Sequence, residues 1–147
     1  MASDNSNYIA SIVSFNLHGF NQSTDAIYEI LDLFKPDCLC VQEHWLTVDN
    51  LFNLDVDPDY FVVSSPALWT AVEKGPIVGR PSGGIATLVN RKLIRECRVL
   101  LNSDRCIIIE FAGFMLINIY LPCVGTENRL GICSEIISDI EFYLSST

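Results

Sequence analysis

The chain has 147 residues, of which 50% are hydrophobic and 18% are charged. This length and composition exclude a disordered or low-complexity protein and allow one domain with a buried core. The formal net charge of −9 argues against a protein that binds nucleic acid through its overall charge.

Basic residues are concentrated in one part of the chain. Up to residue 73 a single lysine stands against eleven acidic residues, whereas six basic and two acidic residues lie between positions 80 and 105. The six are Arg80, Arg91, Lys92, Arg95, Arg98 and Arg105. Two interpretations remain open: this segment contacts a phosphate backbone, or it is a solvated face that balances the acidic half.

The N-terminus and the cysteines indicate a protein that is not secreted. Residues 1–7 contain no basic side chain and lead to no signal-like apolar block, which argues against a secretory signal peptide. We expect these residues to form a flexible N-terminus. The longest apolar run, Cys106–Leu121, contains polar residues and is too short to span a membrane. The six cysteines include no C-x-x-C pair, so we expect reduced core thiols in an intracellular protein, whether nuclear or cytoplasmic.

The first third of the chain predicts a strand, a helix and a second strand. Ile9–Phe15 is apolar on both sides, as in a central strand covered on both faces. A helix follows, capped by Ser23 or Thr24 and ended by Pro36. Its apolar positions are Ile27, Ile30, Leu31 and Phe34. Cys38–Gln42 is the second buried strand, and this order favours an α/β layered domain.

The remaining two thirds predict further strands and a closing helix. The predicted strands are Tyr60–Val63, Ile85–Val89, Cys106–Phe111 and Phe114–Tyr120. The last two form a hairpin that turns at Ala112 and Gly113. The apolar residues of the closing helix are Ile132, Ile136, Ile137, Ile140 and Tyr143.

Two polar residues lie at the ends of predicted buried strands. Asn16 ends the first, and Glu43 follows the second. Ligands bind at this edge of open α/β sheets because strand ends and loops converge there. A carboxylate beside an apolar strand needs a cation or hydrogen-bond donors to remain charged, and Mg²⁺ suits it. Glu43 is therefore a candidate Mg²⁺ ligand, with a solvated strand-end residue as the alternative.

Tyr120 lies two residues beyond Asn118, so both side chains project from one face of their strand. The phenol could donate a hydrogen bond to a phosphate oxygen, or it could lie at the rim of the core. His18 and His44 are the only histidines. If Glu43 faces a cleft, His44 faces away, and we expect both histidines to be packed or exposed loop residues rather than catalytic groups.

Four strings occur in an order that resembles a known family. They read SFNLHGFNQ (residues 14–22), QEHWL (42–46), GRPSGG (79–84) and NIYLP (118–122). The ordered set is similar to the first half of the endonuclease/exonuclease/phosphatase (DNase-I-like) superfamily of Mg²⁺-dependent phosphodiesterases. The first three strings look most like the endonuclease domains of LINE-type non-LTR retrotransposons, which nick DNA.

The resemblance implies an α/β fold, with residues 8–147 forming the first half of a four-layered α/β sandwich. It also implies three catalytic residues. Glu43 would be the ligand of Mg²⁺, with Mn²⁺ as an alternative ion. Asn16 would complete the metal site by orienting the carboxylate and its water, and Tyr120 would contact the scissile phosphate. The implied substrate is DNA.

The chain differs from the family pattern in its remaining motifs. Cys123 stands where most relatives have a phosphate-binding asparagine, and neither Gly-Asp-x-Asn nor Ser-Asp-His occurs in the sequence. In the family these two motifs position the nucleophile and supply the base-like histidine. We therefore expect a partial domain that lacks the C-terminal half and has little activity alone, because loss of a general base costs about 10²–10⁴ in rate.

Each half of such a sandwich is expected to build mainly one sheet. A half-length chain would then expose an apolar sheet face and an unpaired strand edge, which predicts self-association. Three alternatives stay open: a non-catalytic remnant or interaction module, a phosphatase of the same superfamily, and a flavodoxin-like domain. The last would need a phosphate-binding glycine loop after the first strand, which Asn16–Gly19 is not.

Overall fold

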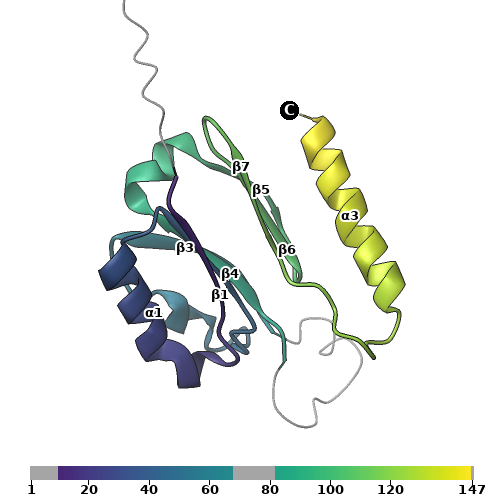
Figure 1. Ribbon diagram of the computed structural model, residues 1–147, viewed down its shortest axis with the longest axis horizontal. Helices are drawn as coiled ribbons and strands as arrows, with labels where there is room; N and C mark the ends of the chain where they lie inside the picture. The colour runs from purple at the N-terminus through teal and green to yellow at the C-terminus, as the bar shows by residue number, and fades with distance from the viewer. Residues whose placement is uncertain (1–9, 68–81, 147) are drawn as a thin grey trace, which may run out of the picture.

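The chain folds into four layers in the order helix, sheet, sheet, helix (Figure 1). The computed structural model describes residues 10–67 and 82–146, so the expected flexible segment 1–7 lies outside the described residues. The strands are β1 (Ile12–Asn16), β2 (Cys38–Gln42), β3 (Tyr60–Ser65), β4 (Ile85–Asn90), β5 (Arg98–Asn102), β6 (Cys106–Glu110) and β7 (Met115–Ile119). The helices are α1 (Phe20–Phe34), α3 (Arg129–Ser145) and the short 3₁₀ helices η1 (Leu51–Leu54) and η2 (Arg91–Glu96). The α/β class is as expected, and none of the described helices is long and apolar enough to cross a membrane.

The first sheet has the strand order β1-β2-β4-β3. β1 and β2 run parallel, and β4 is antiparallel to both β2 and β3. Alternate residues of β2 point to opposite faces. Leu39 and Val41 join Ile27 and Leu31 of α1 in one core, which fixes α1 against the outer face of this sheet.

The second sheet packs its inner face on the first sheet and its outer face on α3. Its order is β5-β6-β7, with antiparallel neighbours throughout. Ile107 and Ile109 of β6 pack with Cys38 and Cys40 of β2, whereas the intervening Ile108 packs with Ile136 of α3. The expectation that this chain builds mainly one sheet and exposes its apolar face is therefore wrong, because a hairpin and a helix of the same chain cover that face.

β1 is an edge strand, so the expected central strand covered on both faces is wrong. Within the described parts of the chain, β1 pairs with β2 alone. Ile12 and Phe15 are 43% and 36% exposed. The apolar pattern of a strand records which residues can be buried but not its place in the sheet order. An unpaired, partly apolar edge is present at β1, and self-association through it stays a prediction.

Helix α1 begins earlier than the capping pattern predicts. Gly19 precedes its first residue, and no side chain caps the helix. The hydroxyls of Ser23 and Thr24 instead donate to the backbone carbonyls of Leu17 and Phe20. The predicted end is confirmed, because Lys35 adopts a left-handed conformation just before the proline at position 36.

The hairpin of β6 and β7 is also confirmed, and Phe111 N donates to Phe114 O across its turn at 2.8 Å. Strand β5 was not predicted. Its sequence is RVLLN, and charged or polar residues at both ends shorten the apolar run that would have indicated a strand.

All six cysteines lie within the described residues as free thiols. Burial raises the pKa of Cys38 to about 12 and that of Cys40 to about 11, so both remain protonated at neutral pH. These thiols pack as small apolar side chains between the two sheets.

Candidate metal centre

Glu43 and Tyr120 bring the two sheets together at one edge of the sandwich. Glu43 follows β2 of the first sheet, and Tyr120 follows β7 of the second. Tyr120 Oη donates a hydrogen bond to Glu43 Oε1 at 2.6 Å, across 77 residues of sequence. Two of the three residues that the sequence singles out are therefore in direct contact.

Backbone hydrogen bonds hold the loop that carries Glu43. Glu43 itself has a left-handed conformation with φ of 56°. Its carbonyl accepts from Gly19 N at 2.8 Å, and Trp45 N donates to Gly83 O at 3.0 Å. The loops after β1 and β2 and the residues before β4 are thus joined, which fixes the direction of the Glu43 side chain.

A second polar bridge crosses between the sheets beside this pair. Gln42 Nε2 donates to Asn118 Oδ1 at 2.9 Å. Asn118 Nδ2 donates to Ala86 O at 2.8 Å and lies 3.1 Å from Thr87 Oγ1. Asn118 is buried, so these bonds satisfy a side chain that would otherwise be costly to bury. The sequence predicts that the Asn118 side chain projects from the same face as Tyr120. It does not predict the contact between Asn118 and Gln42.

His44 is a packed structural residue, as expected. It is fully buried, its Nε2 lies 3.0 Å from Ser65 O, and its Nδ1 accepts from Leu46 N at 2.9 Å. These partners require the neutral ring with its proton on Nε2. Burial lowers the pKa of His44 to about 4, so the ring is neutral at physiological pH.

His18 is an exposed loop residue, as expected, and it lies beside Glu43. Its side chain is 68% exposed, and Nδ1 lies 3.8 Å from Glu43 Oε2. Its backbone N donates to Asn16 Oδ1 at 3.0 Å. Among the described residues no hydrogen bond joins Asn16 to Glu43. Asn16 therefore contacts the loop that carries His18 rather than Glu43 itself.

The phenol of Tyr120 is a neutral donor. Burial, together with the hydrogen bond to Glu43, raises the pKa of Tyr120 above its usual range. Arg105 Nη1 donates to Tyr120 O at 3.3 Å, and its guanidinium carbon lies 5.3 Å from the centre of the ring. Cys123 Sγ lies 4.0 Å from Tyr120 Oη. The site thus gathers a carboxylate, an imidazole, a phenol and a nearby guanidinium.

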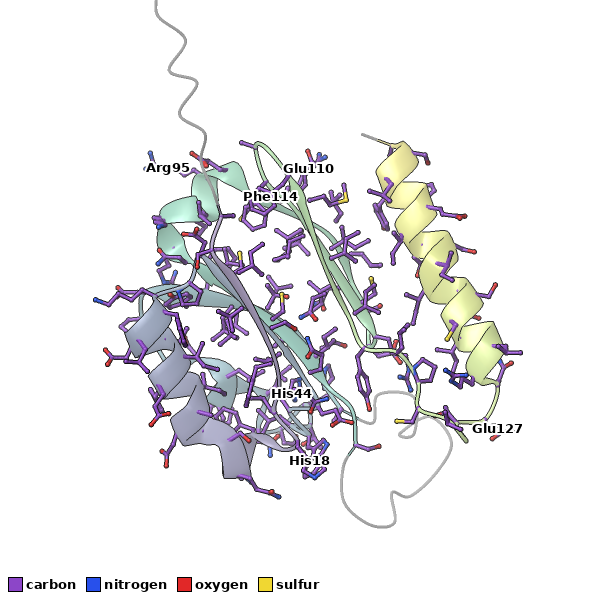
Figure 2. The ribbon with its side chains drawn as sticks, in the orientation of Figure 1. His18, His44, Arg95, Glu110, Phe114 and Glu127 are labelled. Carbon is purple, nitrogen blue, oxygen red and sulfur yellow. The ribbon has the colours of Figure 1, made fainter. Side chains whose placement is uncertain are left out.

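Most of the basic segment lies elsewhere. Lys92 pairs with Asp37 at 2.8 Å, and Arg98 pairs with Glu110 at 2.9 Å. Figure 2 shows Arg95 and Glu110 at the end of the molecule opposite His18 and His44. Residues 79–81 of the GRPSGG string, which include Arg80, lie outside the described residues.

A match to a protein-family model shows which family the chain belongs to. The model of the endonuclease/exonuclease/phosphatase family matches residues 13–126, which include Asn16, Glu43 and Tyr120. The chain belongs to the endonuclease/exonuclease/phosphatase family. Among curated proteins, none matches this sequence.

Solved structures of this family share the fold at low sequence identity. An AP endonuclease from Leishmania major has a TM-score of 0.61 at 19% identity, with 85% of this chain and 45% of that chain covered. An AP endonuclease from Archaeoglobus fulgidus has a TM-score of 0.59 at 21% identity, with 95% and 52% covered. A 3′ phosphatase from Neisseria, bound to a product DNA hairpin, has a TM-score of 0.61 at 16% identity, with 92% and 51% covered. The chain spans about half the length of these solved proteins.

The chemistry of the site fits the divalent cation that family members of this kind typically use. Glu43 Oε1 is occupied by the Tyr120 hydroxyl, whereas Oε2 faces the exposed His18 ring at 3.8 Å. Mg²⁺ binds in proteins through one or two carboxylates, with water and substrate phosphate completing its coordination. In the described parts of the chain no three His, Cys, Asp or Glu side chains form a closed metal cluster. The residues present match an open site with few protein ligands.

Proposed function

We propose that this chain carries half of the active site of a Mg²⁺-dependent DNA phosphodiesterase of the retrotransposon endonuclease type, in an intracellular protein. Glu43 is the Mg²⁺ ligand, Asn16 supports the metal site, and Tyr120 contacts the phosphate. These 147 residues on their own have little catalysis.

One observation carries this proposal: the 2.6 Å hydrogen bond between Tyr120 Oη and Glu43 Oε1. It joins a phenol, which can donate to a phosphate oxygen, to a carboxylate, which can bind a metal ion. The two groups lie at the ends of β7 and β2. Glu43 has a side-chain exposure of 21%, so solvent and a substrate can reach it.

Each residue has a defined task in the proposed reaction. Glu43 would hold the cation, and a bound Mg²⁺ would neutralise charge on the phosphate oxygens. Tyr120 remains protonated, and its single O–H would turn from Glu43 Oε1 to a phosphate oxygen when substrate binds. The buried Gln42–Asn118 bridge keeps the two strand ends at a fixed separation. His44 is buried with both ring nitrogens bonded and does not serve as a general base.

DNA is the proposed substrate for two reasons. The AP endonucleases and the DNA-bound 3′ phosphatase share the fold of this chain, and the strings at residues 14–22 and 42–46 resemble retrotransposon endonucleases. The basic segment adds little support, because Lys92 and Arg98 are paired with acidic groups away from the site. A phosphatase for small phosphate esters is the alternative within the family.

Titration with Mg²⁺ tests the proposal. Wild-type chain, Glu43→Gln and Glu110→Gln are compared by isothermal calorimetry and by NMR of backbone amides. Glu110→Gln is the matched control, because it removes one carboxylate at the opposite end of the molecule (Figure 2). We expect weak binding that is lost in Glu43→Gln and kept in Glu110→Gln. Equal binding by all three proteins would favour a non-catalytic interaction module.

Nicking of supercoiled plasmid in Mg²⁺ tests the expected lack of activity. We expect no nicking by the 147-residue chain, since neither Gly-Asp-x-Asn nor Ser-Asp-His occurs in its sequence. Robust nicking that disappears in Glu43→Ala would show that the chain is a sufficient nuclease and that a group outside the site as described completes it.

A further inference from the structure

The imidazole of His18 is held in a defined position although it is exposed. Its backbone is left-handed, with φ of 48°, and is fixed by the hydrogen bond from His18 N to Asn16 Oδ1. The ring lies edge-on against Trp45, with 4.8 Å between the ring centres and 63° between the planes. Trp45 is in turn held by its backbone bond to Gly83 O. A histidine with no role at the site would not need a ring oriented by two neighbouring loops.

The oriented ring directs Nδ1 toward the second oxygen of Glu43. The distance of 3.8 Å between Nδ1 and Oε2 exceeds the length of a hydrogen bond, so the two groups face each other without bonding. Nitrogen and oxygen ligands of one small cation each lie about 2.0–2.2 Å from it, so a pair at this separation can share an ion. His44 cannot take this role, because both of its ring nitrogens are bonded within the core.

We propose that His18 is a second ligand of the cation held by Glu43, which makes the site one for a transition-metal ion of the Co²⁺ or Zn²⁺ class rather than for Mg²⁺ alone. This inference rests on the proposed function, since it assumes that Glu43 binds a cation. Imidazole suits such ions, whereas Mg²⁺ prefers oxygen ligands and gains little from a nitrogen. A nitrogen ligand from His18 in place of an oxygen ligand thus determines which metal ion the site prefers.

Substitution of His18 by aspartate tests the selection directly. Aspartate tolerates the left-handed backbone and replaces the nitrogen ligand by an oxygen ligand. We expect Co²⁺ affinity to fall by about tenfold or more, because loss of even an outer-shell partner costs about 10–100-fold. Mg²⁺ affinity is expected to stay equal or to rise. Both ions are measured by calorimetry on the full chain.

Spectroscopy supplies a readout that does not depend on activity. The Co²⁺-loaded chain is examined by proton NMR for the strongly shifted N–H signal of a coordinated imidazole. A Cys123→Ser background removes the exposed thiol near Tyr120 as a competing ligand. We expect the shifted signal in this background, its loss in His18→Asp, and its loss in Glu43→Gln.

The outcomes separate this inference from the proposed function. If Glu43→Gln abolishes binding of both ions while His18→Asp leaves Co²⁺ affinity and the shifted signal unchanged, the proposed function stands and His18 is not a ligand. If Glu43→Gln leaves Mg²⁺ binding intact, the proposed function fails first. Unfolding in urea, followed by circular dichroism, confirms that each variant is folded before its titration is interpreted.

Discussion

Substitution of Gly84 by alanine is expected to lower the free energy of unfolding by about 2–5 kcal/mol. Gly84 has φ of +89°, and an added Cβ would overlap the His44 ring, whose nearest carbon lies 2.3 Å away. The left-handed backbone costs about 1–2 kcal/mol for a residue with a side chain. Displacing a fully buried ring from its site adds about 1–3 kcal/mol of overpacking.

Two other glycines separate these contributions. Gly83 also has a positive φ, of +82°, but its added Cβ would meet only Tyr120 Cε1 at 4.0 Å, so we expect about 1–2 kcal/mol for Gly83→Ala. Gly113 has neither a positive φ nor a neighbour within 4 Å, so Gly113→Ala should change stability by less than about 1 kcal/mol. Urea unfolding followed by tryptophan fluorescence measures all three variants. If Gly84→Ala is no less stable than Gly83→Ala, the His44 ring is not held where the structure places it, and the account of this loop is wrong.

Three further predictions concern pH, the buried bridge and the open edge. The pKa of His44 is about 4 when folded and about 6.5 when unfolded, so its contribution is complete above pH 6.5 and is lost as the pH falls toward 4. In urea titrations, acidification should lower the free energy of unfolding of wild type by about 3 kcal/mol more than that of His44→Gln. Parallel pH profiles for the two proteins would contradict this. Asn118→Ala should cost about 2 kcal/mol or more because it leaves buried polar groups unpaired, whereas the exposed Asn102→Ala should cost less than about 1 kcal/mol. Equal urea midpoints for Asn118→Ala and Asn102→Ala would contradict a stabilising role for the Gln42–Asn118 bridge. Light scattering after size-exclusion chromatography should show self-association that Phe15→Lys reduces and Val124→Lys does not, since Val124 is exposed away from the strands. A monodisperse wild-type monomer would refute the edge argument.

The strands could be predicted from sequence more readily than their arrangement. Cys38–Gln42 is an apolar run between Pro36 and Glu43, and such a run in α/β proteins is usually a strand. The order of the strands could not be predicted, because Ile12 and Phe15 look like core residues until their pairing partners are known. The covering of the first sheet was missed because it depends on β6, whose alternate residues supply two cores at once.

The site was partly predictable for a similar reason. Glu43 and Tyr120 follow apolar strands and are carried by family-like strings, so sequence indicated both. The contacts of His18 and Gln42 could not be predicted because they depend on neighbours distant in sequence. Gln42 meets a side chain 76 positions away, and His18 meets Glu43 through loops that are joined only by backbone bonds.

The contact between Glu43 and Tyr120 also has a consequence for folding. Its two residues belong to different sheets, so the pair exists only when the two sheets are docked. Contacts of such long sequence separation form late and slow the search for the native state. A cation bound by Glu43 would stabilise the folded state by about 2.7 kcal/mol at a concentration one hundred times its dissociation constant. Because the carboxylate that holds the ion also accepts a hydrogen bond from the second sheet, occupancy of the site would be linked to how often the two sheets separate.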